Sequence, residues 1–305
     1  GTILRGADLS DTNLTGIDLS GRDLTGTILR GMDLSDKNLT GTILRGADLT
    51  DANLTGIDLS GRDLTGANLT RVDLSGKDLT GSTLTYANLD NADLSNANLT
   101  NAAFLAVDLT KIKNKSLVGT NIQTTSFAHS NLSGVDLSGS TMLKTNFLET
   151  NLTGVDFTAV KNLNYGNIFR EANLTNSNFE GIDLSPKHVF TKTFQDKAEL
   201  ISQATPDLKF ELFQPLYPAS NMLITMHIVD VSVVGNDLEI SYVLANTFAY
   251  ADLKNVNLKN TILWFGLFYN SDLTNADLSG ADLRKAYLGN ADLEGANLEG
   301  AMLDE

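Results

Sequence analysis

Residues 1–26 read GTILRGADLSDTNLTGIDLSGRDLTG, and a leucine stands at every fifth position from Leu4 to Leu24. Asp or Asn precedes most of these leucines, and Ser or Thr follows most of them. A period of five fits neither the α-helical period of about 3.6 residues nor the strand period of two. Because the same spacing continues to Leu109, the sequence predicts a solenoid of short stacked units.

The apolar centre of each unit can be followed along most of the 305 residues. The phase shifts near residues 110–116 and again near 158–168. A segment without the repeat then follows, and the pattern returns at Phe248. We therefore expect repeat coils over residues 1–184, a non-repeat insert over 185–247, and further coils over 248–305 that continue the same solenoid.

Each unit also has a second inward position, two residues before the centre, which is usually small, as at Ala47 and Ala67. Glycine is frequent two residues after the centre, where a corner needs a permissive backbone. Residues 1–25 and 41–65 are nearly identical. This 40-residue recurrence fits two coils of 20 residues, each made of four units.

Units such as ADLSD, ANLTG, ADLSN and ANLEG resemble the repeats of the pentapeptide-repeat family. The resemblance implies an all-β fold, a right-handed quadrilateral parallel β-helix with four pentapeptides in each coil of ~20 residues. It further implies that the large apolar residues stack along the axis of the rod. Asp, Asn, Ser and Thr then face solvent, where the Asp and Asn side chains cap local turns.

Four cationic residues depart from the pattern, because they occupy the small inward position: Arg22, Lys37, Arg62 and Lys77. We expect their stems to run along a corner of the rod, with the charges reaching water or a neighbouring Asp. A buried pathway for ions is the alternative.

The insert carries a hairpin signal, HIVDVSVVGNDLEISYVL, at residues 227–244. The Gly235–Asn236 pair is typical of a two-residue β-turn. Pairing outward from this turn sets Val231 opposite Ile240 and Val229 opposite Tyr242. One face of the predicted hairpin is apolar, which indicates that it packs against another surface. Residues 192–204 have helical spacing and predict a short helix.

The repeat that follows the insert has an unusually apolar exterior over residues 261–270, TILWFGLFYN. We expect the hairpin, or residues 210–218, to cover this aromatic patch. The alternative is an exposed surface for a sugar or a protein. The patch consists of Tyr250, Ile262, Trp264, Phe265, Leu267 and Tyr269.

The composition limits the chemistry. The formal charge of −15 disfavours direct nucleic-acid binding, which rests on clustered Lys and Arg. No apolar run approaches the ~18 residues of a membrane span. The chain has no Cys, and its three histidines lack the spacing of a metal or catalytic site. We expect no enzymatic activity and no cofactor, with Ca²⁺ on the Asp and Asn columns as the alternative.

These observations favour a non-enzymatic scaffold that binds an unidentified protein partner through the rod surface, the insert or the aromatic patch. One alternative is an acidic DNA mimic acting on a type II topoisomerase, similar to the quinolone-resistance members of the family. The other is a calcium-dependent surface or adhesion protein.

The two ends of the repeat lead to two further expectations. The repeat is already in register at residue 1, so we expect the natural chain to begin upstream, where any targeting segment would lie. The compartment is therefore not readable. Unpaired coil edges at the tips predict end-to-end contact between copies, and thus a homo-oligomer.

Overall fold

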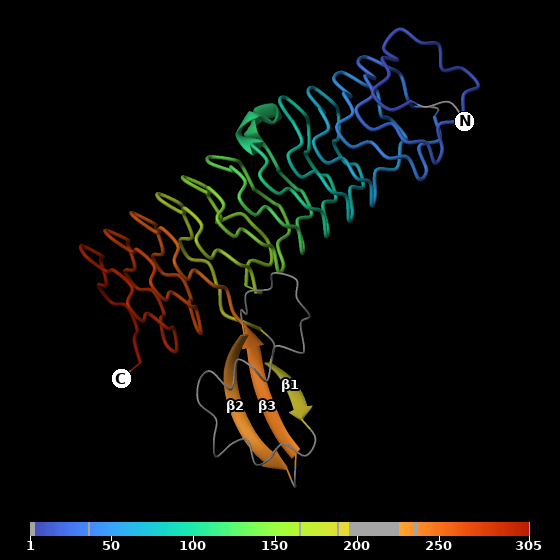
Figure 1. Cartoon of the computed structure of the whole chain (residues 1–305). Coiled ribbons are helices and arrows are strands. Elements are labelled where there is room, and N and C mark those ends of the chain that lie inside the picture. Colours follow the sequence, from blue (N-terminus) through green and yellow to red (C-terminus); the bar gives the residue numbers. More distant parts are fainter. Residues whose placement is uncertain are drawn as a thin grey trace.

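The computed structural model describes residues 4–35, 37–164, 166–187, 189–194, 226–234 and 237–304. The chain winds into a long rod, and a small sheet projects from its side (Figure 1). The rod contains the repeats on both sides of the insert, and the sheet belongs to the insert.

Successive coils are joined by parallel β-bridges at 20-residue spacing, as in the column Asp48, Asn68 and Asn88. Two backbone bonds illustrate each step: Leu49 N donates to Asn68 O at 2.8 Å, and Asn68 N donates to Ala47 O at 2.9 Å. Most coils thus satisfy their peptide groups on the coils above and below them. The expected all-β solenoid of four pentapeptides per coil is confirmed.

Each pentapeptide ends in a tight corner. At one such corner Ala52 N donates to Leu49 O at 2.9 Å, and the backbone of Asp51 lies in the left-handed region with a φ of 58°. Glycine takes this conformation without steric cost, and Asn and Asp tolerate it better than other residues do. This geometry explains why Gly, Asn and Asp recur two residues after the centre.

The centres form a dry axial core, with Leu59 and Phe147 both fully buried. Phenylalanines form one continuous stack along the core, with successive ring centroids 4.9–5.5 Å apart. Its members are Phe104, Phe127, Phe147, Phe169, Phe248 and Phe268. Phe169 and Phe248, on either side of the insert in the sequence, stack at 5.0 Å with an interplanar angle of 2°. The rod therefore continues across the insert without a break.

The first phase shift is absorbed at a corner by two short 3₁₀ helices, η1 (Leu109–Lys111) and η2 (Lys113–Lys115). The Asp108 side chain caps η1 by accepting a hydrogen bond from Thr110 N. At the second shift, Asn167 is fully buried and donates through Nδ2 to Leu163 O at 2.8 Å. Extra residues are thus accommodated at corners, and the stacked segments stay in register.

The insert contributes three strands in the order β1-β3-β2, all antiparallel: β1 (Val189–Phe194), β2 (Met226–Val234) and β3 (Asp237–Leu244). Val231 lies opposite Ile240. Tyr242 faces Ile228 and not Val229, because the register shifts between Ile228 and Asp230.

The sequence does not predict β1. The helix expected over residues 192–204 is wrong at 192–194, which are part of this strand. Period-based reasoning fails here because a six-residue strand offers too few positions to separate a period of 2 from one of 3.6. The Gly235–Asn236 turn and residues 195–204 lie outside the described residues.

Candidate interaction surface

The outward carboxylates of the rod are tied to their own corners. Asp58 Oδ1 accepts hydrogen bonds from Ser60 N at 2.9 Å and from Ser60 Oγ at 2.6 Å. These bonds from Ser60 lower the pKa of Asp58 below its usual range. Asn53 Oδ1 accepts from Thr55 N at 3.0 Å in the same way. The Asp and Asn columns therefore cap turns, as the sequence predicts, and present fixed negative charge to solvent.

One side of the rod lacks this carboxylate covering, and we call it the neutral face. We define it by the outward residues immediately before and after each centre, over the coils from Leu84 to Leu288. Bridges link the first column through Thr83, Ala103, Ser126, Asn146, Ile168, Thr247, Leu267 and Tyr287. The second column contains Thr85, Leu105, Ala128, Leu148, Arg170, Ala249, Tyr269 and Gly289. Arg170 is the one charged side chain among these sixteen positions.

The other three faces differ sharply over the same coils, because each carries several carboxylates in the equivalent columns. The face after the neutral face holds Asp90, Asp108, Asp252, Asp272, Asp292 and Glu294. The opposite face holds Asp93, Asp136, Asp156, Glu180, Asp277 and Glu299. The remaining face holds Asp78, Asp183 and Asp282, and Asp304 follows one coil later. The charge of the chain is thus concentrated on three sides of the rod.

The N-terminal coils of the same side carry paired charges. Arg5 Nε lies 3.4 Å from Asp23 Oδ2, and Arg45 Nη1 lies 3.5 Å from Asp63 Oδ2. Both arginine side chains are more than half exposed, so each ion pair is screened by water and adds little stability. These coils therefore present accessible guanidinium groups beside the neutral face.

The C-terminal end of the neutral face is aromatic. The rings of Tyr250 and Tyr269 meet edge to face at 5.6 Å, and those of Tyr269 and Tyr287 lie 6.0 Å apart at 24°. Tyr250 and Tyr287 are 47% and 53% exposed. The Arg170 guanidinium lies 5.3 Å from the centre of the Tyr250 ring. Aromatic and arginine side chains exposed together are typical of protein-binding surfaces.

The structure divides the six residues of the predicted aromatic patch between two faces. Leu267 and Tyr269 lie on the neutral face, with Tyr250 at its edge. Ile262 lies on the preceding face, where it bridges to Asp282. Trp264 and Phe265 are at the corner between the two faces.

At this corner, Arg284 lies 5.0 Å from the Trp264 ring and Lys285 lies 5.2 Å from the Phe265 ring. Trp264 is 40% exposed. Residues 210–218 lie outside the described residues, so the expectation that the insert covers the patch stays a prediction.

Tyr287, Arg170 and the middle of the neutral face are missing from the predicted patch. The signal for them is present in the sequence, but it emerges only when residues are aligned in columns of 20 across both phase shifts and the insert. Aligning the centres at Leu84, Phe104, Phe127, Phe147 and Phe169 reveals the uncharged columns.

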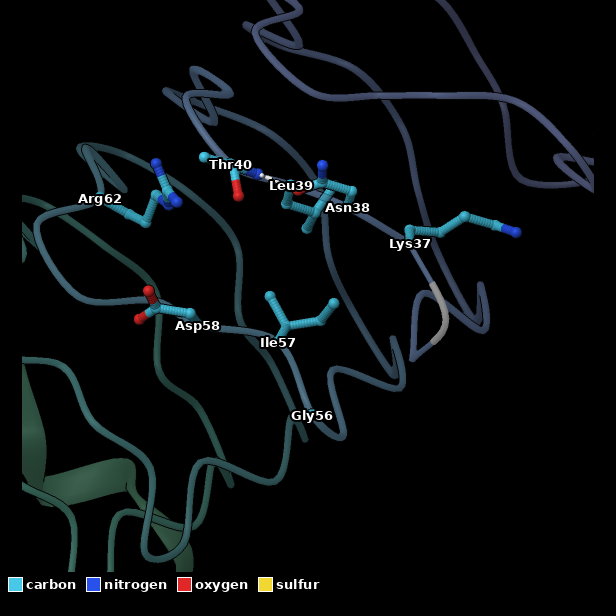
Figure 2. A pocket seen from close by; sticks show the side chains of 8 residues that line it. All are labelled: Lys37, Asn38, Leu39, Thr40, Gly56, Ile57, Asp58 and Arg62. Carbon is cyan, nitrogen blue, oxygen red and sulfur yellow. Dashed lines mark hydrogen bonds between the residues drawn. The ribbon is translucent and has the colours of Figure 1, made fainter.

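A second surface feature is a pocket of about 160 Å³ between two N-terminal coils. Figure 2 shows its lining, with Arg62 and Asp58 on one coil and Lys37 extending away from the other lining side chains. On this face the bridges begin at Asp78 and Asn98. Nearer the N-terminus the inward position of this face holds the larger residues Ile17, Lys37 and Ile57.

Arg62 departs from the expected behaviour of the inward cations, because its buried Nε has no hydrogen-bond partner. Arg22, in contrast, is exposed as the sequence predicts. Of the charged lining residues, Lys37 extends away from the other side chains, and the Asp58 carboxylate lies beside Arg62 and balances its charge (Figure 2). We regard the pocket as a local opening of the ladder, and the neutral face as the candidate site.

Two negative observations concern the described part of the chain. It gathers no group of three or more His, Asp or Glu side chains that could hold a metal ion. It also contains no helix long and apolar enough to cross a membrane. The calcium alternative stays a prediction.

The geometry of stacked pentapeptides agrees with the comparison to known families. Pentapeptide repeats match in eight copies, within residues 2–36, 23–61, 63–110, 120–158, 251–290, 267–300 and 283–305. The chain therefore belongs to the pentapeptide-repeat family. No curated protein sequence matches it.

Among solved structures, the chain is similar to HetL, a pentapeptide repeat protein involved in heterocyst differentiation regulation from the cyanobacterium Nostoc sp. strain PCC 7120. The identity is 23% over 93% of this chain and 84% of that one, with a TM-score of 0.31. It is also similar to QnrB1, a plasmid-mediated fluoroquinolone resistance protein, at 15% identity over 80% and 92% of the two chains, with a TM-score of 0.31. These likenesses concern the fold alone.

Proposed function

We propose that this pentapeptide-repeat scaffold is a non-catalytic interaction module that binds protein through its neutral face. The observation that carries the proposal is the absence of carboxylates from both outward columns of one face, in a chain with a net charge of −15. Glu149 and Glu171 lie at the corner of this face, beside His129 and Arg170. That side runs through eight stacked coils, from Thr83 to Gly289.

The physical argument concerns desolvation. Burying a carboxylate against a partner is costly unless the charge is matched by new hydrogen bonds or an ion pair. Thr, Ala, Leu and Tyr side chains carry a much smaller penalty, and their apolar atoms gain from burial. The neutral face is thus the side of the rod that a protein can cover at least cost.

The rigidity of the rod supports the same function. The backbone of each coil is hydrogen-bonded to its neighbours, so the outward side chains are already held in rows. A preorganised surface loses little conformational freedom on binding, which leaves more of the contact energy as affinity. The side chains of the neutral face are suited to contact more than to proton transfer, which requires groups with tuned pKa values.

Photo-crosslinking with a matched pair of positions tests the proposal. Leu148 lies on the neutral face, and Leu143 lies five residues earlier on the preceding face; both follow a centre directly and both are half-buried. We expect p-benzoylphenylalanine at position 148 to give covalent adducts with protein in cells that make the chain, and the same residue at 143 to give none. Adducts at both positions, or at neither, would refute the proposal.

The two other functions have direct tests of their own. For a topoisomerase-directed DNA mimic, inhibition or protection of gyrase supercoiling at micromolar protein is the required result. For a calcium-dependent adhesion protein, titration calorimetry must show heat on addition of Ca²⁺. If either result is positive and no adducts form at position 148, the acidic faces and not the neutral face are the functional surface.

A further inference from the structure

We infer that the neutral face docks on the neutral face of a second copy of this chain, giving a side-by-side, antiparallel dimer. This inference rests on the proposed function and names the partner of the same surface. It is carried by the charge distribution, by the sizes of the residues along the second column, and by the area available.

Charge selects the face. Two copies that meet through any of the other three faces bring columns of Asp and Glu together, and like charges in contact are destabilising. The neutral face contributes Arg170 as its one charged side chain over eight coils. For a chain with a net charge of −15, it is the side with the fewest carboxylates. The four N-terminal coils add Asp23 and Asp63, which lie beside Arg5 and Arg45. The corner next to the second column adds Glu149 and Glu171, which lie beside His129 and Arg170.

Residue size selects the antiparallel direction. A two-fold axis that crosses the rod between the coils of Phe104 and Phe127 brings the second column of one copy against the same column of the other. Along the second column each large side chain then faces a smaller one, whereas in the first column Asp63 faces Ile168 and Asp23 faces Leu267. The opposed pairs are Leu105 with Ala128, Leu148 with Thr85, Arg170 with Thr65, Arg45 with Ala249, Tyr269 with Thr25, and Arg5 with Gly289.

The two ends of the face also complement each other in charge and chemistry. Arg45 of one copy arrives beside Tyr250 of the other, and Arg5 arrives beside Tyr269. Guanidinium groups over tyrosine rings are favourable, more so when the contact excludes water. The Arg5 and Arg45 side chains are 63% and 57% exposed, and a turn toward a second copy exchanges their ion pairs with Asp23 and Asp63 for the tyrosine rings.

The area is sufficient for a specific contact. Twelve coils at a spacing of ~4.8 Å give a face about 53 Å long, and three residues at ~3.3 Å each give a width of about 10 Å. The product is about 530 Å² per copy, or about 1,060 Å² in total, which is just above the ~1,000 Å² that a specific protein interface needs. We expect a reversible dimer.

Sedimentation equilibrium on the purified protein tests the dimer. The wild type should associate to twice its mass of 32.8 kDa. Leu148→Asp should weaken the association at least tenfold, because the two-fold axis buries the new charge twice. Leu143→Asp, on the preceding face, should leave it unchanged, and circular dichroism checks that both variants keep the fold. A wild type that stays monomeric at about 100 μM, or equal behaviour of the two variants, would overturn the inference.

Cysteine crosslinking tests the direction without perturbing the charge. The chain has no native cysteine, so Thr85→Cys and Leu148→Cys can be prepared separately and mixed. The antiparallel dimer predicts a disulfide between the two variants under mild oxidation. These positions lie three coils apart, so a parallel or end-to-end dimer leaves them unlinked and would refute the direction. A monomer that still forms adducts at position 148 in cells would overturn the dimer and leave the proposed function standing.

Discussion

The phenylalanine stack offers a quantitative test of how the rod is held together. Phe169 contacts four other rings: Phe147 at 5.2 Å, Phe248 at 5.0 Å, Phe157 at 5.8 Å and Phe179 at 6.0 Å. Among the described rings, Phe104 at the end of the stack contacts Phe127 alone, at 5.2 Å. Both side chains are fully buried. Replacing each by leucine therefore removes a similar volume but a different number of ring contacts.

The expected difference follows from those contacts. An aromatic pair adds about 0.5–1.5 kcal/mol beyond the burial of its area. Phe169 has three more ring partners than Phe104, so Phe169→Leu should cost roughly 1.5–4.5 kcal/mol more than Phe104→Leu. The loss of buried area and the residual cavity contribute to both variants and largely cancel in the comparison.

Urea unfolding followed by far-UV circular dichroism measures the difference across the whole rod. The fluorescence of Trp264, the only tryptophan, reports separately on the C-terminal coils. Because stacked repeats can unfold in parts, agreement of the two signals is needed before the free energies are compared. Equal destabilisation by the two substitutions would refute the view that ring stacking stabilises the axis beyond simple burial.

Two further predictions concern the base of the insert and the C-terminal coils. Asn246→Leu should destabilise the rod by about 2–4 kcal/mol and speed proteolysis at the insert, because it removes the acceptor of the buried Asn167 N–H and the side-chain donor to Leu184 O. Unchanged denaturation and cleavage would contradict this. The pKa of Asp282 is lowered to about 2, mainly by a hydrogen bond from Arg284, and so lies below the ~3.9 of an unfolded chain. The bond therefore contributes its full stability above pH ~4 and loses it as the pH falls from about 4 to 2. An acid titration of Trp264 fluorescence should show this transition in the wild type and lack it in Asp282→Asn.

The regular part of the fold is predictable from sequence because the residues of each pentapeptide determine its own conformation. Leu59 is a buried centre, Ala52 is small enough for the second inward position, and Gly46 permits the positive φ of a corner. The same three requirements recur in every coil. The insert is different. Its strand β1 pairs with a strand that begins more than forty residues later, and no local pattern encodes such a partner.

The candidate surface was predictable in part for a related reason. The aromatic cluster around Trp264 is visible as a local run of apolar residues. The neutral face is not local, because its members are separated by 20–23 residues, and by 79 between Ile168 and Thr247 across the insert. The face can be recognised only when the residues are aligned in columns, and this alignment requires the coil length and both phase shifts.

The closure of the rod beneath the insert has a practical consequence. The coil that precedes the insert and the coil that follows it are in direct contact through Phe169 and Phe248, and the Asn167–Asn246 pair fastens the corner from which the insert departs. The solenoid thus has one internal corner at which an insertion leaves the stacking of the coils intact. A foreign domain whose ends lie close together can replace the three strands there, so that it is held at a fixed position along the rod.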